Sequence, residues 1–391
     1  MPEPKNESTP GSLGRARAAV SAAFFLFGMG FGLWFVNIPV VAGRLDIEPG
    51  ILGLALLVAG LGSVLAQPIA GTVISRVGSR PAAIALFLVF LATFAAPILA
   101  PSLPLLFAGA LLLGLTGGAF NVAVNTQASE VEAARGKPTM SSFHGCFSLG
   151  GFAGALANGY ATSLGHGDGR GALALAAVML VIGAVVSFGF PPSRQVEASG
   201  EKDPAFALPR GAILSLAGLA FICNGLEGSV NDWSTLYLAT VRGLNEGAAS
   251  VGFAAFAATM AICRLLGGPV VARIGERAIL LYGGVIAAAG LAFVTLAPWT
   301  SLAPAGFVLV AIGLANTMPI LISLAARTPG AAPSIHVAAV ATAALVGFLV
   351  GPPIIGFTAQ LLGLGTAITL LALPALAVTA GASLRRWQPA L

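Results

Sequence analysis

Long apolar stretches follow one another along almost the whole chain and are separated by short polar segments. Each is about 20 residues or longer, enough for a helix to cross a hydrocarbon core of about 30 Å. The apolar positions run on without alternating with polar ones, so the pattern excludes barrel strands. We predict an all-α integral membrane protein whose twelve transmembrane helices occupy residues 18–43, 49–74, 81–100, 103–127, 140–164, 170–190, 211–240, 247–271, 278–298, 302–326, 334–361 and 365–384.

The composition strengthens this prediction. Hydrophobic residues make up 57% of the 391 positions and charged residues only 8%, whereas about 25% of a soluble protein is charged. The three cysteines, Cys146, Cys223 and Cys263, all fall inside predicted spans, so we expect no disulfide framework. Residues 1–17 are polar and are not followed by a cleavage site, so we expect no removable signal peptide.

The basic residues indicate the orientation in the membrane. The net charge is +5, but these residues are spread over short loops and form no single face, so we expect no nucleic-acid partner. Three lie on one side (Arg44, Arg170 and Arg242), and Arg264 lies within a span. Because cytoplasmic loops collect Lys and Arg, we predict a bacterial inner-membrane protein with both termini in the cytoplasm. The fifteen residues on the cytoplasmic side are Lys5, Arg15, Arg17, Arg76, Arg80, Arg135, Lys137, Arg194, Lys202, Arg210, Arg273, Arg277, Arg327, Arg385 and Arg386.

A polar segment between the sixth and seventh spans divides the chain into two halves. We predict a cytoplasmic tail at 1–17, a six-helix bundle at 18–190, a cytoplasmic linker at 191–210, and a second six-helix bundle with a short cytoplasmic tail at 211–391.

The two halves repeat each other. Gly114 and Gly313, and likewise Gly151 and Gly347, are separated by nearly the same distance in the sequence. A Gly-x4-Arg-x-Gly-x-Arg loop follows the second span and recurs 197 positions later, at Gly71, Arg76, Gly78 and Arg80 and at Gly268, Arg273, Gly275 and Arg277.

Two parallel six-helix repeats joined by a linker resemble the major facilitator superfamily, and the repeated loops resemble its signature loop. Three stretches resemble the MosC-like branch and, more distantly, fucose-type sugar permeases: Asn121–Glu130, His144–Gly151 and Phe221–Tyr237. The resemblance implies a monomeric transporter that works by alternating access, with its site at the midplane between the halves. We find no phosphate-binding loop or metal-ligand spacing and expect no cofactor.

The chain departs from the superfamily pattern in two ways. Ser75 and Ala272 replace the Asp that usually precedes the first Arg of each signature loop, so an Asp-based latch is missing. The fifth span also lacks the Gly-Pro pair of drug antiporters. The usual sequence argument for drug efflux therefore fails.

The seventh span carries the most polar residues. Asn224, Glu227 and Asn231 are spaced so that they share one helical face. Gly225 and Gly228 bracket Glu227, and we predict that they break the helix, as in the discontinuous helices of many transporters.

The two acids of this span, Glu227 and Asp232, are proton-coupling candidates. Burial favours the neutral form of a carboxyl group, so Glu227 could take up and release a proton. The alternative for Glu227 is a structural hydrogen bond or ion pair. For Asp232, which is closer to the outer surface, we weigh a helix-capping or gating role against substrate contact.

Three further ionisable residues are candidates. Arg264 could pair with Glu227, bind an anionic group of the substrate, or extend to the nearby membrane interface. His144 could relay protons or serve as a structural residue. Glu130 could be a coupling acid, because fucose-type permeases carry one in the fourth span, or an acid paired in the loop.

The resemblance implies that the first, fourth, seventh and tenth spans line the central cavity. Amides there could bind a polar solute through donors and acceptors, or they could join helices. Indoles could stack on a sugar. The substrate-binding candidates are Trp34, Asn37, Asn121, Asn125, Asn224, Asn231, Trp233, Arg264 and Asn316.

These observations predict a secondary active transporter, not an enzyme. We expect it to move a small polar organic solute, sugar-like or inositol-like by analogy, together with protons. The alternatives are a proton-driven exporter of a metabolite or drug and a transport-inactive membrane sensor or scaffold.

Overall fold

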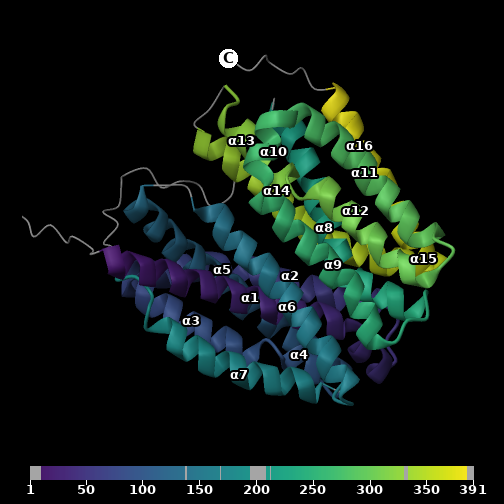
Figure 1. Cartoon of the computed structure of the whole chain (residues 1–391), viewed down its shortest axis with the longest axis horizontal. Coiled ribbons are helices and arrows are strands. Elements are labelled where there is room, and N and C mark those ends of the chain that lie inside the picture. The colour runs from purple at the N-terminus through teal and green to yellow at the C-terminus, as the bar shows by residue number, and fades with distance from the viewer. Residues whose placement is uncertain are drawn as a thin grey trace, which may run out of the picture.

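The computed structural model describes residues 10–136, 139–167, 169–193, 208–211, 213–329 and 333–384. The regular elements of these residues are helices (Figure 1). The N-terminal half contains α1 (Pro10–Leu45), α2 (Pro49–Val77), α3 (Ser79–Thr93), α4 (Ala96–Leu99), α5 (Leu103–Arg135), α6 (Met140–Ser163) and α7 (Arg170–Ser187). The C-terminal half contains α8 (Ile213–Thr240), α9 (Glu246–Leu265), α10 (Gly267–Ile274), α11 (Glu276–Leu296), the 3₁₀ helix η1 (Thr300–Leu302), α12 (Ala303–Leu314), α13 (Thr317–Ala326), α14 (Pro333–Leu362), α15 (Leu364–Leu370) and α16 (Ala372–Leu384).

Helices occupy the position of every predicted span. Eleven helical segments in the described part of the chain are long and apolar enough to cross a membrane. The fifth predicted span corresponds to α6, whose 24 residues extend for about 36 Å. It is not among the eleven, because Gly, Ser, His and Asn make its sequence less apolar.

Some predicted boundaries differ from the structure or cannot be compared with it. Residues 10–17, assigned to the N-terminal tail, are the first turns of α1. Most of the predicted linker lies outside the described residues. So do six of the basic residues used to predict the orientation: Lys5, Lys137, Arg194, Lys202, Arg385 and Arg386.

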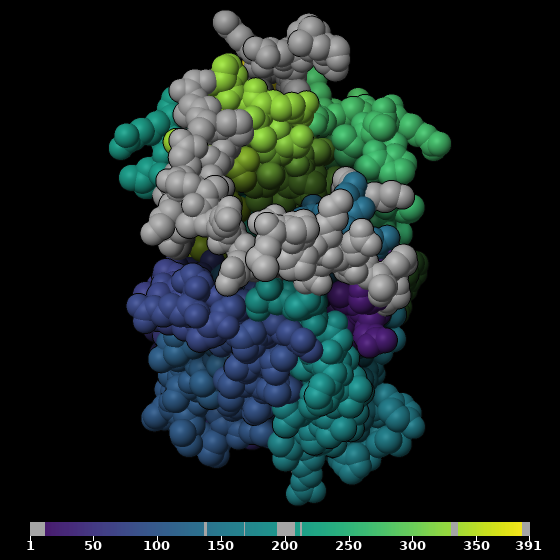
Figure 2. Space-filling view, turned by 90° about the vertical axis from the view of Figure 1, so that its left-hand side faces the viewer, coloured from purple at the N-terminus to yellow at the C-terminus, as the bar shows by residue number. Residues whose placement is uncertain are grey.

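The two halves form two helical bundles that lie side by side (Figure 1). We call the end of the molecule at which α1 and α8 begin the start end, and the end at which they finish the far end. The bundles meet mainly where α2 packs against α14, α6 against α9 and α1 against α8. Figure 2 looks onto the start end, where the surface of the C-terminal half is hollowed.

Glycines permit the closest helix crossings within each half. A Cβ atom on Gly150 of α6 would overlap the carbonyl oxygen of Phe25 in α1. Likewise, a Cβ atom on Gly347 of α14 would overlap the carbonyl oxygen of Phe221 in α8. Small residues let membrane helices approach to backbone contact, so the same device holds the corresponding pair of helices in each repeat.

The predicted break in the seventh span is wrong. The span forms the uninterrupted helix α8, and its glycines serve the packing against α14. A Cβ atom on Gly225 would lie 3.2 Å from the Gly347 carbonyl oxygen, and one on Gly228 would lie 3.1 Å from the Phe348 ring. Asp232 lies inside a continuous helix, so it does not cap a helix start.

The internal repeat extends to backbone conformation. Gly78 has φ 92° and ψ 157°, and Gly275 has φ 87° and ψ 147°. Each residue ends one helix and precedes the next. Because L side chains rarely adopt such positive φ values, glycine is required at both turns.

An arginine at the far end also repeats between the halves, which the sequence comparison missed. Nη2 of Arg44 donates to the carbonyl oxygens of Ile98 and Ala100, at 2.7 and 2.8 Å. Arg242, 198 positions later, donates to Ala297 at 2.6 Å and to Thr295 at 3.4 Å. Each arginine satisfies carbonyl groups at a helix C-terminus that have no partner within the helix.

Gly347→Ala should lower the midpoint of thermal unfolding, because the added methyl group must push α8 and α14 apart. Overpacking of this kind costs about 1–3 kcal/mol. Gly218→Ala is the matched control, since Gly218 lies in α8, the helix that Gly347 packs against, and has nothing within 4 Å of an added Cβ atom. We expect the control to keep or slightly raise the midpoint, as measured on purified protein in detergent. Equal midpoints for the two variants would contradict the packing role of Gly347.

Candidate functional site

The polar face of α8 carries an ion pair near the middle of the helix. Nη2 of Arg264, on α9, lies 3.0 Å from each carboxylate oxygen of Glu227. Of the three alternatives weighed for Arg264, the structure has this pairing. The Arg264 and Glu227 side chains are 21% and 19% exposed, so the protein does not enclose the pair completely.

Two proline-induced helix breaks lie next to this ion pair. Pro319 has no N–H group, so the carbonyl oxygen of Ala315, four residues earlier, loses its helical donor between α12 and α13. In the same way, Pro269 leaves the carbonyl oxygen of Leu265 without its helical donor, and α9 gives way to α10 at Leu266. Both interruptions of the membrane helices therefore coincide with a proline, although Pro68, Pro352 and Pro353 lie inside uninterrupted helices.

Two side chains join these breaks reciprocally. Nε of Arg264 donates to the freed carbonyl oxygen of Ala315 at 3.4 Å. Nδ2 of Asn316 donates to the carbonyl oxygen of Cys263 at 3.3 Å. Arg264 thus binds the carboxylate of α8 and the broken segment of α12 and α13 at the same time. Asn316, predicted to contact substrate, is 9% exposed and holds the two breaks together.

His144 brings the N-terminal half to the same site. It lies on α6, and its ring stands edge-on to Phe24, with centroids 5.3 Å apart. A Cβ atom on Gly145, beside His144, would lie 2.8 Å from Cδ2 of Leu265, beside Arg264. The site therefore combines titratable groups from both halves.

The remaining polar residues of α8 differ in exposure. Asn224 and Asn231 are partly exposed on the same face as Glu227, and neither amide has a hydrogen-bond partner among the residues described. Asp232 is 5% exposed. It lies one turn beyond Gly228, on the face that packs against α14 and away from the Glu227 face.

Three substrate candidates lie in packed regions. Trp34 and Asn37 are 2% and 1% exposed. Nδ2 of Asn37 donates to the Leu33 carbonyl oxygen at 2.7 Å and to Oδ1 of Asn158 in α6 at 2.8 Å. Trp233 is fully buried and donates through Nε1 to the Pro352 carbonyl oxygen at 3.2 Å. None of the three is open to a solute in this conformation.

The candidates on α5 are two partly exposed amides and one acid closer to the start end. Asn121 and Asn125 are partly exposed, and Nδ2 of Asn125 donates to the carbonyl oxygen and to Oδ1 of Asn121, at 2.8 and 3.0 Å. Glu130 accepts a 3.0 Å hydrogen bond from Nε2 of Gln127, which also donates to Oγ of Ser79 at 2.9 Å. Glu130 thus belongs to a network that joins α5 to α3.

The signature loops lie at the start end. The backbone N–H of Arg80 donates to Oγ of Ser193 at 3.0 Å, and its Nη2 donates to the Phe188 carbonyl oxygen at 3.2 Å. In the other half, Arg327 pairs with Glu276 of the corresponding loop at 2.5 Å. The other arginines of the two loops, Arg76, Arg273 and Arg277, are exposed, and a Cβ atom on Gly71 or Gly268 would meet nothing within 4 Å.

Comparison with known proteins identifies the family. The sequence profile of the Major Facilitator Superfamily matches residues 20–344. An uncharacterised transporter of this type from Yersinia pestis is 35% identical over 92% of this chain and 93% of its own length. Membrane protein MosC of Rhizobium meliloti is 32% identical over 90% of this chain and 85% of its own length.

Solved structures share the fold. The crystal structure of the nucleoside transporter NupG covers 94% of this chain and 98% of its own, with a TM-score of 0.73 and 12% identity. A bacterial homologue of the human lysosomal transporter Spinster, in an inward-facing and occupied conformation, covers 95% and 98%, with a TM-score of 0.71 and 16% identity. The resemblance inferred from the signature loops and from the stretches around Asn121, His144 and Glu227 is thereby confirmed: the chain belongs to the Major Facilitator Superfamily and is a membrane transporter of the MosC-like type.

Proposed function

We propose that this transporter moves a small polar organic solute across the bacterial inner membrane by alternating access, coupled to protons, with Glu227 as the coupling acid. The observation that carries the proposal is the partly exposed Glu227–Arg264 ion pair near the middle of α8. Ionisable groups at such depths are costly and commonly mark transport pathways.

Protonation of Glu227 and its pairing with Arg264 oppose each other. A carboxylate attracts the guanidinium, whereas a protonated carboxyl group carries no charge and loses that attraction. Taking up a proton would therefore release Arg264 from α8. Because Arg264 also holds the Ala315 carbonyl oxygen, its release would change how α8 is connected to the breaks between α9 and α10 and between α12 and α13.

Because protonation of Glu227 opposes its pairing with Arg264, the proton would bind more strongly to one conformation than to the other, as coupled transport requires. A ligand shifts a conformational equilibrium only if it binds one state better than the other. In this proposal the proton favours the state without the ion pair. His144, near the beginning of α6 in the other half, would pass protons between the pair and the start end.

The surrounding amides suit a solute with several hydroxyl or amide groups. Asn224 and Asn231 lie beside Glu227, and Asn121 and Asn125 lie on α5. Each amide offers both donors and acceptors. Similarity to MosC supports a sugar-like or inositol-like solute by analogy alone.

The proposed orientation determines whether this conformation is inward-facing or outward-facing. The excess of Lys and Arg near the termini places the start end in the cytoplasm. The contacts between the halves at the far end, near Gly53 and Gly356 and near Gly159 and Gly247, then support an inward-facing state. We further propose that the transporter acts as a monomer and needs no cofactor, since each half of the site lies in the same chain.

Glu227→Gln should abolish solute-dependent proton movement, because the amide cannot take up or release a proton. Asp232→Asn is the comparison, since Asp232 lies on the α14 face and away from Arg264. We expect it to retain coupling. The measurement uses a pH-sensitive dye trapped in proteoliposomes that are challenged with a panel of sugars and inositols. Coupling that survives Glu227→Gln, or is lost equally in Asp232→Asn, would refute Glu227 as the coupling acid; a panel that moves no protons would refute coupling for these solutes.

Asn231→Ala should raise the KM for the transported solute about fivefold with little change in kcat, because one lost hydrogen bond is worth about 1 kcal/mol. Asn37→Ala is the structural counterpart: it removes the α1–α6 hydrogen bond and should lower the unfolding midpoint without changing KM. Initial rates of solute uptake and thermal unfolding test the two variants together. An unchanged KM in Asn231→Ala, or a raised KM in Asn37→Ala, would contradict this division.

A further inference from the structure

The internal repeat creates two matching contacts between the halves at the far end. In one, the beginning of α2 meets the end of α14, and a Cβ atom on Gly356 would lie 3.0 Å from Cα of Gly53. In the other, the beginning of α9 meets the end of α6, and a Cβ atom on Gly159 would lie 3.7 Å from the Gly247 carbonyl oxygen. Gly159 and Gly356 are 197 positions apart, as the repeat requires.

Each contact has a glutamate at the start of the helix, but only one glutamate is bonded. Glu48, just before α2, accepts a 2.6 Å hydrogen bond from Nε2 of Gln360 on α14. Glu246 lies 198 positions after Glu48 and begins α9. Its carboxylate has no hydrogen-bonding or charged partner in the described ranges.

The difference follows from one shortened side chain. A displacement of 197 positions relates Gln360 to Ser163 at the end of α6. Oγ of Ser163 donates to the Tyr160 carbonyl oxygen of its own helix at 2.7 Å. Ser163 therefore does not bridge to Glu246, and the space that a glutamine would fill is left open.

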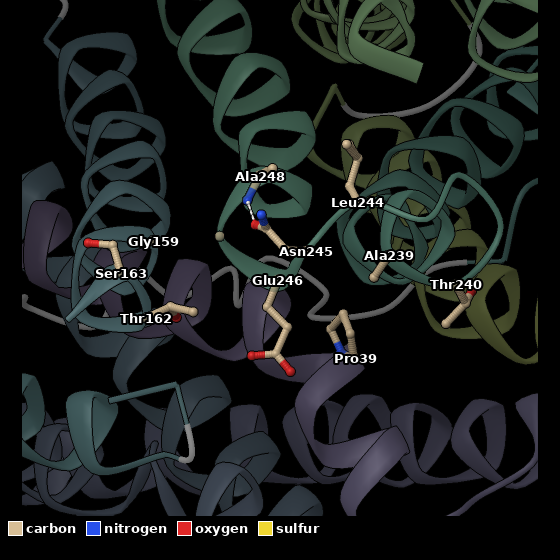
Figure 3. A pocket seen from close by; sticks show the side chains of 11 residues that line it. Pro39, Gly159, Thr162, Ser163, Ala239, Thr240, Leu244, Asn245, Glu246 and Ala248 are labelled. Carbon is tan, nitrogen blue, oxygen red and sulfur yellow. Dashed lines mark hydrogen bonds between the residues drawn. The ribbon is translucent and has the colours of Figure 1, made fainter. Parts of the chain in front are cut away.

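A pocket of about 820 Å³ occupies this position, between α6 and α1 of one half and α8 and α9 of the other (Figure 3). Its volume falls within the range of small-molecule sites, about 300–1,000 Å³. In Figure 3 the Glu246 carboxylate extends between Thr162 and Pro39. Thr162 and Ser163, at the end of α6, also line the pocket.

We propose that this pocket binds a small organic cation whose ammonium group pairs with Glu246. The described residues that line the pocket include no Lys, Arg or His, so an ammonium group would supply the missing partner for the carboxylate through charge-assisted hydrogen bonds. A neutral solute would leave the carboxylate without a counter-charge, and an anion would be repelled.

The ligand would bridge the two halves, since Ser163 of the first half and Glu246 of the second both line the pocket. The ligand would thus connect α6 to α9 as the Gln360–Glu48 hydrogen bond connects α14 to the beginning of α2. Binding would favour the conformation in which the far end is closed, because only that conformation brings the two residues together. The proposal does not depend on Glu227 or on proton coupling.

Cysteine labelling tests the charge preference of the pocket. Ser163→Cys is introduced into a chain whose Cys146, Cys223 and Cys263 are replaced by Ser, and the purified protein reacts with a cationic or an anionic methanethiosulfonate. Glu246→Gln should lower the ratio of the cationic to the anionic rate at least about fivefold, the effect of one unit charge near 4 Å in water. Glu48→Gln is the matched control and should leave the ratio unchanged. Thr240→Cys, which also lines the pocket, replaces Ser163→Cys if that variant fails to fold.

Protection by a defined ligand tests binding itself. Glucosamine should slow the labelling of the Ser163→Cys variant at concentrations at which glucose, which lacks the ammonium group, does not. The protection should disappear when Glu246→Gln is added and remain when Glu48→Gln is added. Equal protection by the two sugars, protection that survives Glu246→Gln, or no protection by glucosamine would overturn the proposal.

Discussion

A charged group inside a membrane needs a partner, and the ion pair between Glu227 and Arg264 satisfies this constraint for the C-terminal half. The acid lies near the middle of α8, where an unpaired charge would be costly. Its partner also holds the carbonyl oxygen that Pro319 leaves without a helical donor. One guanidinium therefore neutralises α8 and stabilises the break between α12 and α13. Anything that removes the charge of Glu227 acts on three membrane spans together.

The structural features around this pair occur in both halves of the internal repeat, whereas the candidate sites lie where the two halves differ. Glycine crossings, the turns at Gly78 and Gly275, and the capping arginines Arg44 and Arg242 occur in both halves. The breaks joined by Arg264 lie in the C-terminal half, and at the far end only one of two matching glutamates is bonded. A duplicated scaffold thus stabilises both bundles while individual substitutions create sites between them. The same glycines that permit close packing keep the crossings intact as polar side chains vary.

Much of the fold followed from the sequence, because continuous apolar runs specify membrane helices and the 197-residue displacement reveals the repeat. The shared face of Asn224, Glu227 and Asn231 also followed, since helical spacing is local. The predicted break at Gly225 and Gly228 was wrong because glycine can either break a helix or permit close packing. Here the two glycines pack against α14, which is distant in the sequence. The true breaks lie at Pro269 and Pro319, but proline alone would not have located them, since Pro68, Pro352 and Pro353 lie inside uninterrupted helices. The burial of Trp34, Asn37 and Trp233 depends on which helices lie against them, which spacing alone does not reveal.

The claim that the ion pair links these helices is tested most directly by a double-mutant cycle on thermal stability in lipid nanodiscs. The cycle compares Glu227→Gln, Arg264→Gln and the combined variant. Each single change leaves one charge in the membrane without its partner, whereas the combined change removes both charges. The account predicts that the double variant is more stable than the sum of the single effects by about 1–3 kcal/mol, a range set by the partial exposure of the pair. Single effects that add to within about 0.5 kcal/mol would show that the two residues are not coupled and would contradict the account.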